Sequence, residues 1–113
     1  MTIDMLTTYG ANTKEGLQRC MNNESFYLRL VKMIAGDVHF QELYDAVDAG
    51  DLAAAFDAAH ALKGSAGNLA LTPIFTPVSE ITELLRARTE MDYTPLVAAI
   101  RAAHNKLQEI CAD

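Results

Sequence analysis

The residues best suited to chemistry gather in segment 51–71, which reads DLAAAFDAAHALKGSAGNLAL. On a helix of 3.6 residues per turn, His60, Gly64 and Gly67 fall on one face. Lys63 lies at the border of that face. An unprotonated imidazole is a nucleophile near neutral pH, because the ordinary pKa of histidine is about 6.5. With an ammonium group beside it and little bulk around it, such a histidine could receive a phosphoryl group from another protein.

The two glycines need an explanation, because a glycine inside a helix costs about 1 kcal/mol relative to alanine. Taken alone, Gly64 and Gly67 would be explained by close packing of a neighbouring helix, or by a helix that ends at Gly67. Beside an outward histidine and a lysine we favour a different function for them. There the glycines would admit the backbone of a partner protein to the imidazole.

The opposite side of the same helix is apolar and predicts burial. Its residues recur at spacings of four and three: Leu52, Phe56, Ala59, Leu62, Ala66 and Leu69. Asp51 precedes them and is expected to cap the helix by accepting from free backbone N–H groups. The histidine helix is therefore predicted to present one face to the core and the other to solvent.

The string His-Ala-Leu-Lys-Gly at residues 60–64, followed by Gly67, resembles the H-x-L-K-G signature of histidine-containing phosphotransfer domains. Residues similar to those of the family also stand elsewhere: Tyr9-Gly10, Glu15-Gly16-Leu17, Arg19, Tyr27, Leu30 and residues 68–85. The resemblance thus runs from Thr7 to the last predicted helix.

The resemblance implies that His60 exchanges a phosphoryl group with the aspartate of response-regulator receiver domains, and that hybrid sensor kinases are further partners. Lys63 would offset the negative charge of the phosphoryl oxygens, and Gly64 and Gly67 would leave room for the docked receiver. The family's architecture is a helical bundle with the histidine exposed midway along one helix. Many members add a polar side chain from the neighbouring helix. Ser79 and Thr82 are available here, but neither matches the family's pattern, so this support stays open.

Other chemistry is not indicated. The chain has no phosphate-binding P-loop and no kinase signature, so we expect a phosphate carrier without cofactor or ATP site, and not an enzyme. Any magnesium would belong to the receiver. No histidine and carboxylate pair has the spacing of a helical metal site, and no metal is expected. His39 and His104 lack the pattern around His60 and are expected to be surface or boundary residues.

The composition predicts a single domain over residues 1–113, with a formal net charge of −6. An acidic chain without a basic run is a poor ligand for nucleic acid or anionic lipid and favours a protein partner. Cys20 and Cys111 lack metal-binding spacing and are expected to be reduced. No secretion signal or apolar run of about 20 residues is present, so we expect a cytoplasmic protein. A monomer is expected for an isolated domain of this type, but an additional exposed apolar face would allow pairing, so the oligomeric state stays open.

Apolar periodicity and cap residues predict an all-α fold. The expected helices cover roughly these residues: 1–9, 13–21, 24–35, 38–49, 51–71, 73–89 and 93–111. Short links imply an antiparallel bundle of four principal helices, with shorter ones over one end. The start of the sixth helix is open. Either it begins at Pro73 and loses one hydrogen bond at Pro77, or residues 73–75 form a separate turn.

Two functions of different classes follow. The first is a stand-alone phosphotransfer protein in a multistep phosphorelay. The second is a helical adaptor that docks on receiver domains or other signalling proteins without being phosphorylated. His60, Lys63, Gly64 and Gly67 together favour the first, because an adaptor has no physical need for that combination.

Overall fold

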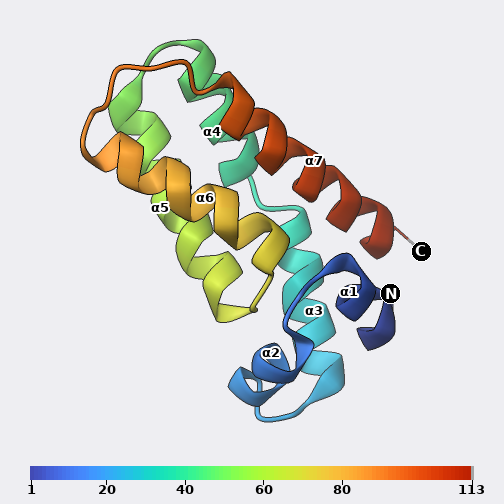
Figure 1. The fold of residues 1–113 in the computed structure, drawn as a ribbon. Helices are drawn as coiled ribbons and strands as arrows, with labels where there is room; N and C mark the ends of the chain where they lie inside the picture. Colours follow the sequence, from blue (N-terminus) through green and yellow to red (C-terminus); the bar gives the residue numbers. More distant parts are fainter. Residues whose placement is uncertain (113) are drawn as a thin grey trace.

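The computed structural model describes residues 1–112, and within them it contains seven helices and no strand (Figure 1). The helices are α1 Ile3–Tyr9, α2 Thr13–Arg19, α3 Glu24–Ala35, α4 His39–Asp48, α5 Leu52–Asn68, α6 Thr72–Arg86 and α7 Thr94–Cys111.

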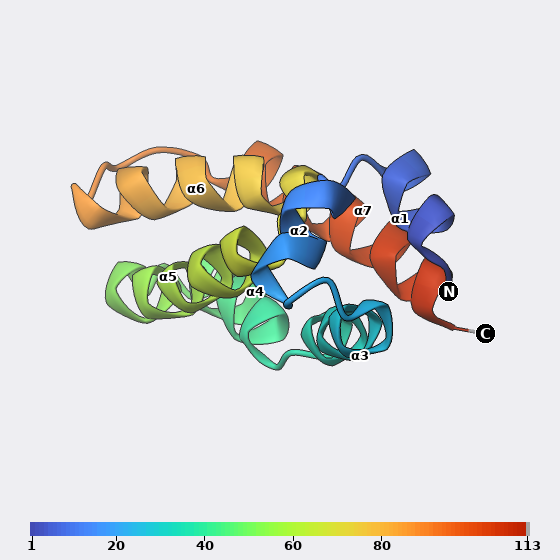
Figure 2. The same cartoon turned by 90° about the horizontal axis from the view of Figure 1, so that it is seen from below.

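The long helices form an antiparallel bundle. Helix α5 packs against α4 on one side and α6 on the other, and α6 in turn packs against α7 (Figure 1). Helices α3 and α4 follow one another along α7, and α1 lies against the end of α7. Helix α2 crosses the end of α5 where α6 begins (Figure 2). The prediction of an all-α antiparallel bundle with short N-terminal helices is confirmed.

The core side of α5 consists mainly of small residues, which let α4 and α6 approach closely. Its buried residues are Ala55, Ala58, Ala59, Leu62 and Ala66. Leu52 and Phe56, predicted to be buried, are only half-buried, because they lie in the first turns of α5, near the end of the bundle. There Ala55 and Ala58 complete the buried side of the helix.

Polar side chains cap three helices, and at α5 the capping residue is Asp51, as the sequence predicts. Asn12, Asn23 and Asp51 each accept a hydrogen bond from the backbone N–H three residues later. Asp37 acts slightly differently: its carboxylate accepts from the backbone N–H of His39, at the start of α4. Local polar side chains therefore separate the helices at these four links.

The open question about α6 is resolved. The helix begins at Thr72, with Leu71 in the N-cap position and Pro73 in the first turn. A proline there sacrifices no helical hydrogen bond, because the first N–H groups of a helix have no partner within it. Pro77 lies inside the same helix and removes one backbone donor.

Two predictions about single residues are wrong. Met21, which helical spacing over the predicted helix 13–21 places inside, is 83% exposed and has a φ of 56°, because α2 already ends at Arg19 and the chain turns there. His104, expected at the surface or boundary, is buried and only 8% exposed. It lies on the apolar stripe of α7 between Ile100 and Leu107.

The buried His104 ring joins three helices. Its Nε2 donates to the carbonyl of Ala35 at 2.8 Å, and the ring stacks on Phe40 with centroids 3.7 Å apart. The hydroxyl of Tyr44 lies 3.4 Å from Nδ1 and donates to it. Burial lowers the pKa of the imidazole, so the neutral ring is favoured in the folded protein.

Candidate functional site

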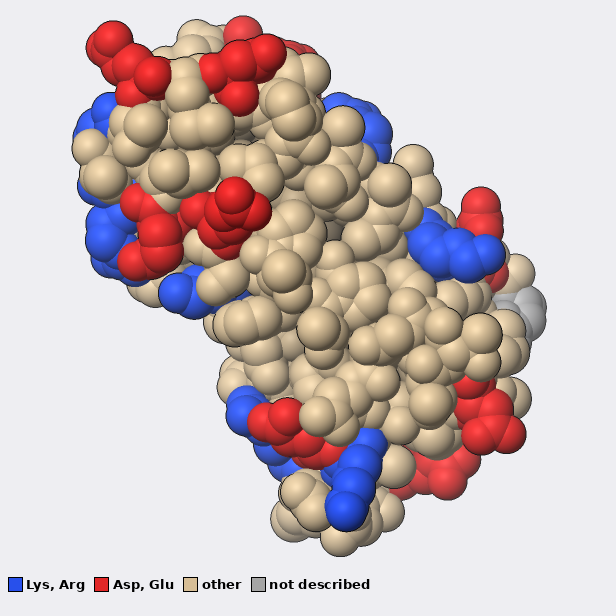
Figure 3. Space-filling model, in the orientation of Figure 1, with Lys and Arg blue, Asp and Glu red and all other residues tan. Residues whose placement is uncertain are grey.

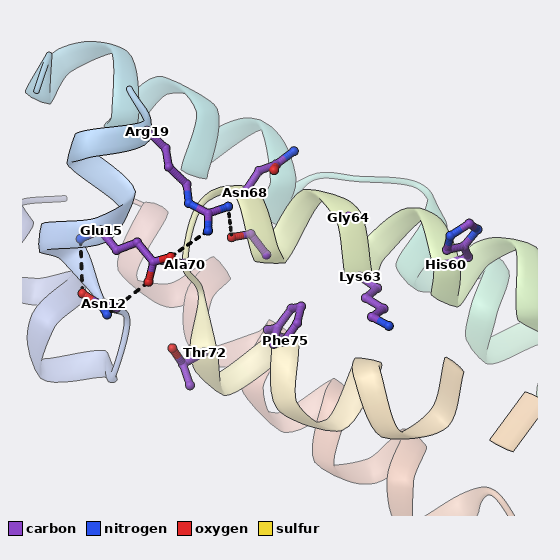
Figure 4. A pocket seen from close by; sticks show the side chains of 11 residues that line it. Asn12, Glu15, Arg19, His60, Lys63, Gly64, Asn68, Ala70, Thr72 and Phe75 are labelled. Carbon is purple, nitrogen blue, oxygen red and sulfur yellow. Dashed lines mark hydrogen bonds and ion pairs between the residues drawn. The ribbon is translucent and has the colours of Figure 1, made fainter. Parts of the chain in front are cut away.

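His60 lies midway along α5 and is exposed to solvent. The helix continues through its glycines to Asn68, so the histidine is held on a regular turn and not in a loop. Figure 4 shows the imidazole on the outer side of α5, one turn before Gly64. Within residues 1–112, no hydrogen bond or ion pair engages the ring. Its nitrogens are therefore open to a reaction partner.

Lys63 extends from α5 toward α6 (Figure 4). Its Nζ lies 3.6 Å from Oε2 of Glu83, and the two side chains are 31% and 56% exposed. Such an exposed ion pair contributes at most about 1 kcal/mol, and often less. The ammonium group can therefore exchange this carboxylate for another anion at small cost.

The two glycines of the signature have different surroundings. A Cβ added at Gly64 would meet nothing within 4 Å. A Cβ at Gly67 would lie 3.0 Å from Cε1 of Phe75 on α6. Gly67 thus serves close packing between α5 and α6, whereas the space above Gly64 is open.

A groove of about 490 Å³ runs along this face, and we call it the site groove. One end is lined by His60, Lys63 and Gly64, and Phe75 lies between the two ends (Figure 4). The other end is lined by three side chains from the N-terminal part: Asn12, Glu15 and Arg19. The sequence shows the spacing of Glu15 and Arg19, but their approach to the histidine helix depends on the fold.

Arg19 ties α2 to the end of α5. Its Nη2 forms an ion pair with Oε1 of Glu15 at 2.7 Å, and its Nη1 donates to the carbonyl of Gly67 at 3.3 Å. The backbone N–H of Asn12 donates to the carbonyl of Ala70 at 2.9 Å. The far end of the site groove is thereby fixed relative to His60.

Gly16 lets α2 lie directly on the ring of Tyr27. A Cβ at Gly16 would stand 2.6 Å from Cε1 of that ring. The hydroxyl of Tyr27 donates to the carbonyl of Leu69 at 2.8 Å, and burial raises its pKa to about 12. Helices α2 and α3 therefore share one buried contact with the end of α5.

The polar candidates on α6 lie outside the site groove. Thr82 is fully buried, and its hydroxyl donates to the carbonyl of Val78 at 2.6 Å. Ser79 is half-buried and does not line the groove. The sequence pattern did not single out Glu83, the α6 residue whose side chain forms an ion pair with Lys63. In the sequence, Glu83 could have been found as a polar residue one helical turn after Ser79, on the same side of α6.

Basic side chains accompany the site although the chain carries a net charge of −6. Arg19 and Lys63 line the groove, and Arg86 and Arg88 at the end of α6 lie near the ring of Phe56. Figure 3 shows basic and acidic side chains side by side along its left edge, acidic groups at the top, and groups of both signs at the right and bottom. Glu15 and Glu83 pair with three of these four basic groups, so the site keeps only a small excess of positive charge over its carboxylates.

Within residues 1–112, no three histidine, cysteine or carboxylate side chains gather into a group that could hold a metal ion. None of the helices there combines the length and apolar character that crossing a bilayer requires.

A comparison with protein families identifies the family of this chain. The family model for the Hpt domain matches residues 35–110, which include α4, α5, α6 and most of α7. Neither a curated protein nor a solved structure matches the chain. Hpt domains are phosphocarriers without kinase activity that interact with receiver domains and kinases in phosphorelays. Because the match spans more than half of the sequence, the chain belongs to the Hpt domain family.

Proposed function

We propose that this protein relays a phosphoryl group between His60 and the aspartate of response-regulator receiver domains, free or attached to hybrid sensor kinases, in the cytoplasm. The observation that carries the proposal is the exposed imidazole, with open space above Gly64 and an ammonium group within the same groove. Membership of the Hpt domain family supports it.

In the proposed step, the lone pair of an unprotonated His60 ring nitrogen attacks the phosphorus of an aspartyl phosphate. A nitrogen–phosphorus bond forms while the bond between phosphorus and the carboxylate oxygen breaks, and the carboxylate leaves with that electron pair. The ring carries an extra positive charge until the proton on its other nitrogen passes to water. The reverse sequence returns the group to a second receiver.

Lys63 stabilises the transferred group in this proposal. Its ammonium exchanges the carboxylate of Glu83, 3.6 Å away, for the phosphoryl oxygens, which carry more negative charge. Gly64 leaves the approach to the imidazole clear for the receiver. The receiver supplies the phosphoaspartate and any magnesium that its own site requires.

The experiment is transfer from a panel of phosphorylated receiver domains, with the modified residue identified by mass spectrometry at neutral or basic pH. We expect acid-labile label on His60 and none on His60→Gln, which keeps the fold because the side chain is exposed and makes no hydrogen bond within residues 1–112. Label on His60→Gln would contradict the assignment. If no receiver labels the folded wild-type protein, the non-phosphorylated adaptor becomes the better function.

A further inference from the structure

Phe56 lies one helical turn before His60 and contacts its ring. The two ring centroids are 5.4 Å apart and the ring planes differ by 23°, which is a stacked arrangement. Residues four apart on a helix face the same side, so regular α5 geometry brings the rings together. Phe56 is half-buried, although its spacing predicts a core position. Part of the Phe56 ring therefore lies at the protein surface, next to the imidazole.

This contact matters for the orientation of the imidazole, because no hydrogen bond or ion pair from the described residues holds the ring. Reactive histidines are normally oriented by a hydrogen bond to the second ring nitrogen. Within the described residues 1–112, His60 has no such partner. A nucleophile that transfers a phosphoryl group must nevertheless point its lone pair along the line of attack. Among the described residues, the stacked phenyl ring of Phe56 is the contact that can restrict the orientation of the imidazole.

Two arginines hold the phenyl ring in turn. The guanidinium carbon of Arg86 lies 5.0 Å from the Phe56 ring centre, and that of Arg88 lies 5.6 Å from it. Both are within the range of a cation–π contact. Arg88 is anchored to the end of α6, where its Nη1 donates to the carbonyl of Leu85 at 2.6 Å. Arg86 forms an ion pair with Glu83 at 3.4 Å.

These contacts form a chain around the site. Glu83 bridges Lys63 and Arg86, and Arg86 contacts Phe56, which stacks on His60. The end of α6 is thereby coupled to the side chains on both sides of the proposed nucleophile.

We propose that Phe56 is a positioning residue for His60, and that Arg86 and Arg88 keep its ring in place. This rests on the proposed function of His60. Aromatic pairs of this kind shift conformational populations by about two- to tenfold. Removing the ring should therefore slow the chemical step by a similar factor, without affecting where a receiver docks.

The test compares wild type with Phe56→Leu, which keeps an apolar side chain, and with Phe56→Tyr, which restores a ring. Phe26→Leu is the matched control, because Phe26 is also half-buried but lies on α3 and makes no ring contact with His60 within residues 1–112. Each protein reacts with phosphoramidate, a small donor that phosphorylates imidazole and releases ammonia, and with a phosphorylated receiver. NMR shifts of the His60 ring protons report whether an aromatic ring stays beside them.

We expect Phe56→Leu to lose the ring-current shift and to react about two- to tenfold more slowly with both donors. Phe56→Tyr should restore both signals, and Phe26→Leu should match wild type. If Phe56→Leu folds poorly, Arg86→Gln with Arg88→Gln, both exposed, should give a smaller change in the same direction.

Two results would overturn the proposal on Phe56 while leaving His60 as the acceptor. One is an unchanged phosphoramidate rate in Phe56→Leu. The other is slowing with the receiver alone, which would make Phe56 a docking residue. Failure of the proposed function looks different: wild type would not be labelled on His60 by any donor, and the positioning role would fall with it.

Discussion

Gly64 lies one turn after His60, and a side chain added there points into open space. We therefore expect Gly64→Val to keep the free energy of unfolding within about 1 kcal/mol of wild type. Transfer from a phosphorylated receiver should nevertheless slow, because the new side chain occupies the approach to the imidazole. The rate with phosphoramidate should change much less.

Ala54→Val is the matched control for Gly64→Val. Ala54 is also exposed on α5 but lies away from the histidine face. Stopped-flow transfer and chemical denaturation of both variants separate docking from stability. Equal transfer by Gly64→Val and wild type would show that the open space is not part of the receiver interface.

His104 makes stability depend on pH. Burial lowers its pKa in the folded protein, and the hydrogen bond to Ala35 offsets this only in part. In the unfolded chain a histidine titrates near pH 6.5, so below that pH the unfolded chain binds the extra proton more readily. The stabilisation is therefore complete above pH about 6.5 and is lost as the pH falls below it.

Denaturant unfolding of wild type and His104→Gln between pH 7.5 and pH 5 checks this. The slope that one proton can add is at most about 1.4 kcal/mol per pH unit. We expect the wild-type free energy of unfolding to fall more steeply on acidification than that of the variant. Parallel curves would show that His104 does not carry the effect, since His39 and His60 are present in both proteins.

Helix α2 can pack against α3 because Gly16 has no side chain at the contact. In Gly16→Ala the new Cβ would stand 2.6 Å from the ring of Tyr27, which is buried and donates to Leu69. Either the ring or α2 must move, and overpacking of this kind costs about 1–3 kcal/mol. We expect that loss in the free energy of unfolding, measured by chemical denaturation.

Gly36→Ala is the control for this substitution. Its Cβ would meet only the carbonyl oxygen of Met33 at 3.9 Å, an ordinary contact. It should therefore leave stability nearly unchanged. A Gly16→Ala variant as stable as Gly36→Ala would mean that α2 adjusts without loss.

The helices could be predicted from the sequence because their signals are local. Asn23 and Asp51 cap the helices that follow them, and the signature around His60 identifies the face that carries the site. The contact of Gly16 with Tyr27 joins residues from two helices, so periodicity alone does not reveal it. The apolar spacing of α5 predicts a buried Phe56. Its position near the end of the bundle, which depends on the fold, instead leaves the ring half-buried and stacked on His60.

Charge is distributed unevenly over the molecule, and this distribution affects the rate at which a receiver domain encounters the site. The chain carries a net charge of −6, but Arg19, Lys63, Arg86 and Arg88 accompany the site. Long-range attraction and repulsion between exposed charges weaken beyond a Debye length of about 8 Å at physiological salt. Local positive charge at the site can therefore guide docking even on an acidic protein.

We expect kcat/KM for transfer from a receiver to fall as ionic strength rises from 0.05 to 0.5 M, because screening weakens attraction to an acidic receiver surface. Arg86→Gln with Arg88→Gln should flatten this dependence, whereas Lys106→Gln, a control on the exposed side of α7, should not. Maximum rates at saturating receiver should change little with salt. A kcat/KM that is constant or rises with salt in wild type would show that the basic residues of the site do not steer the encounter with the receiver.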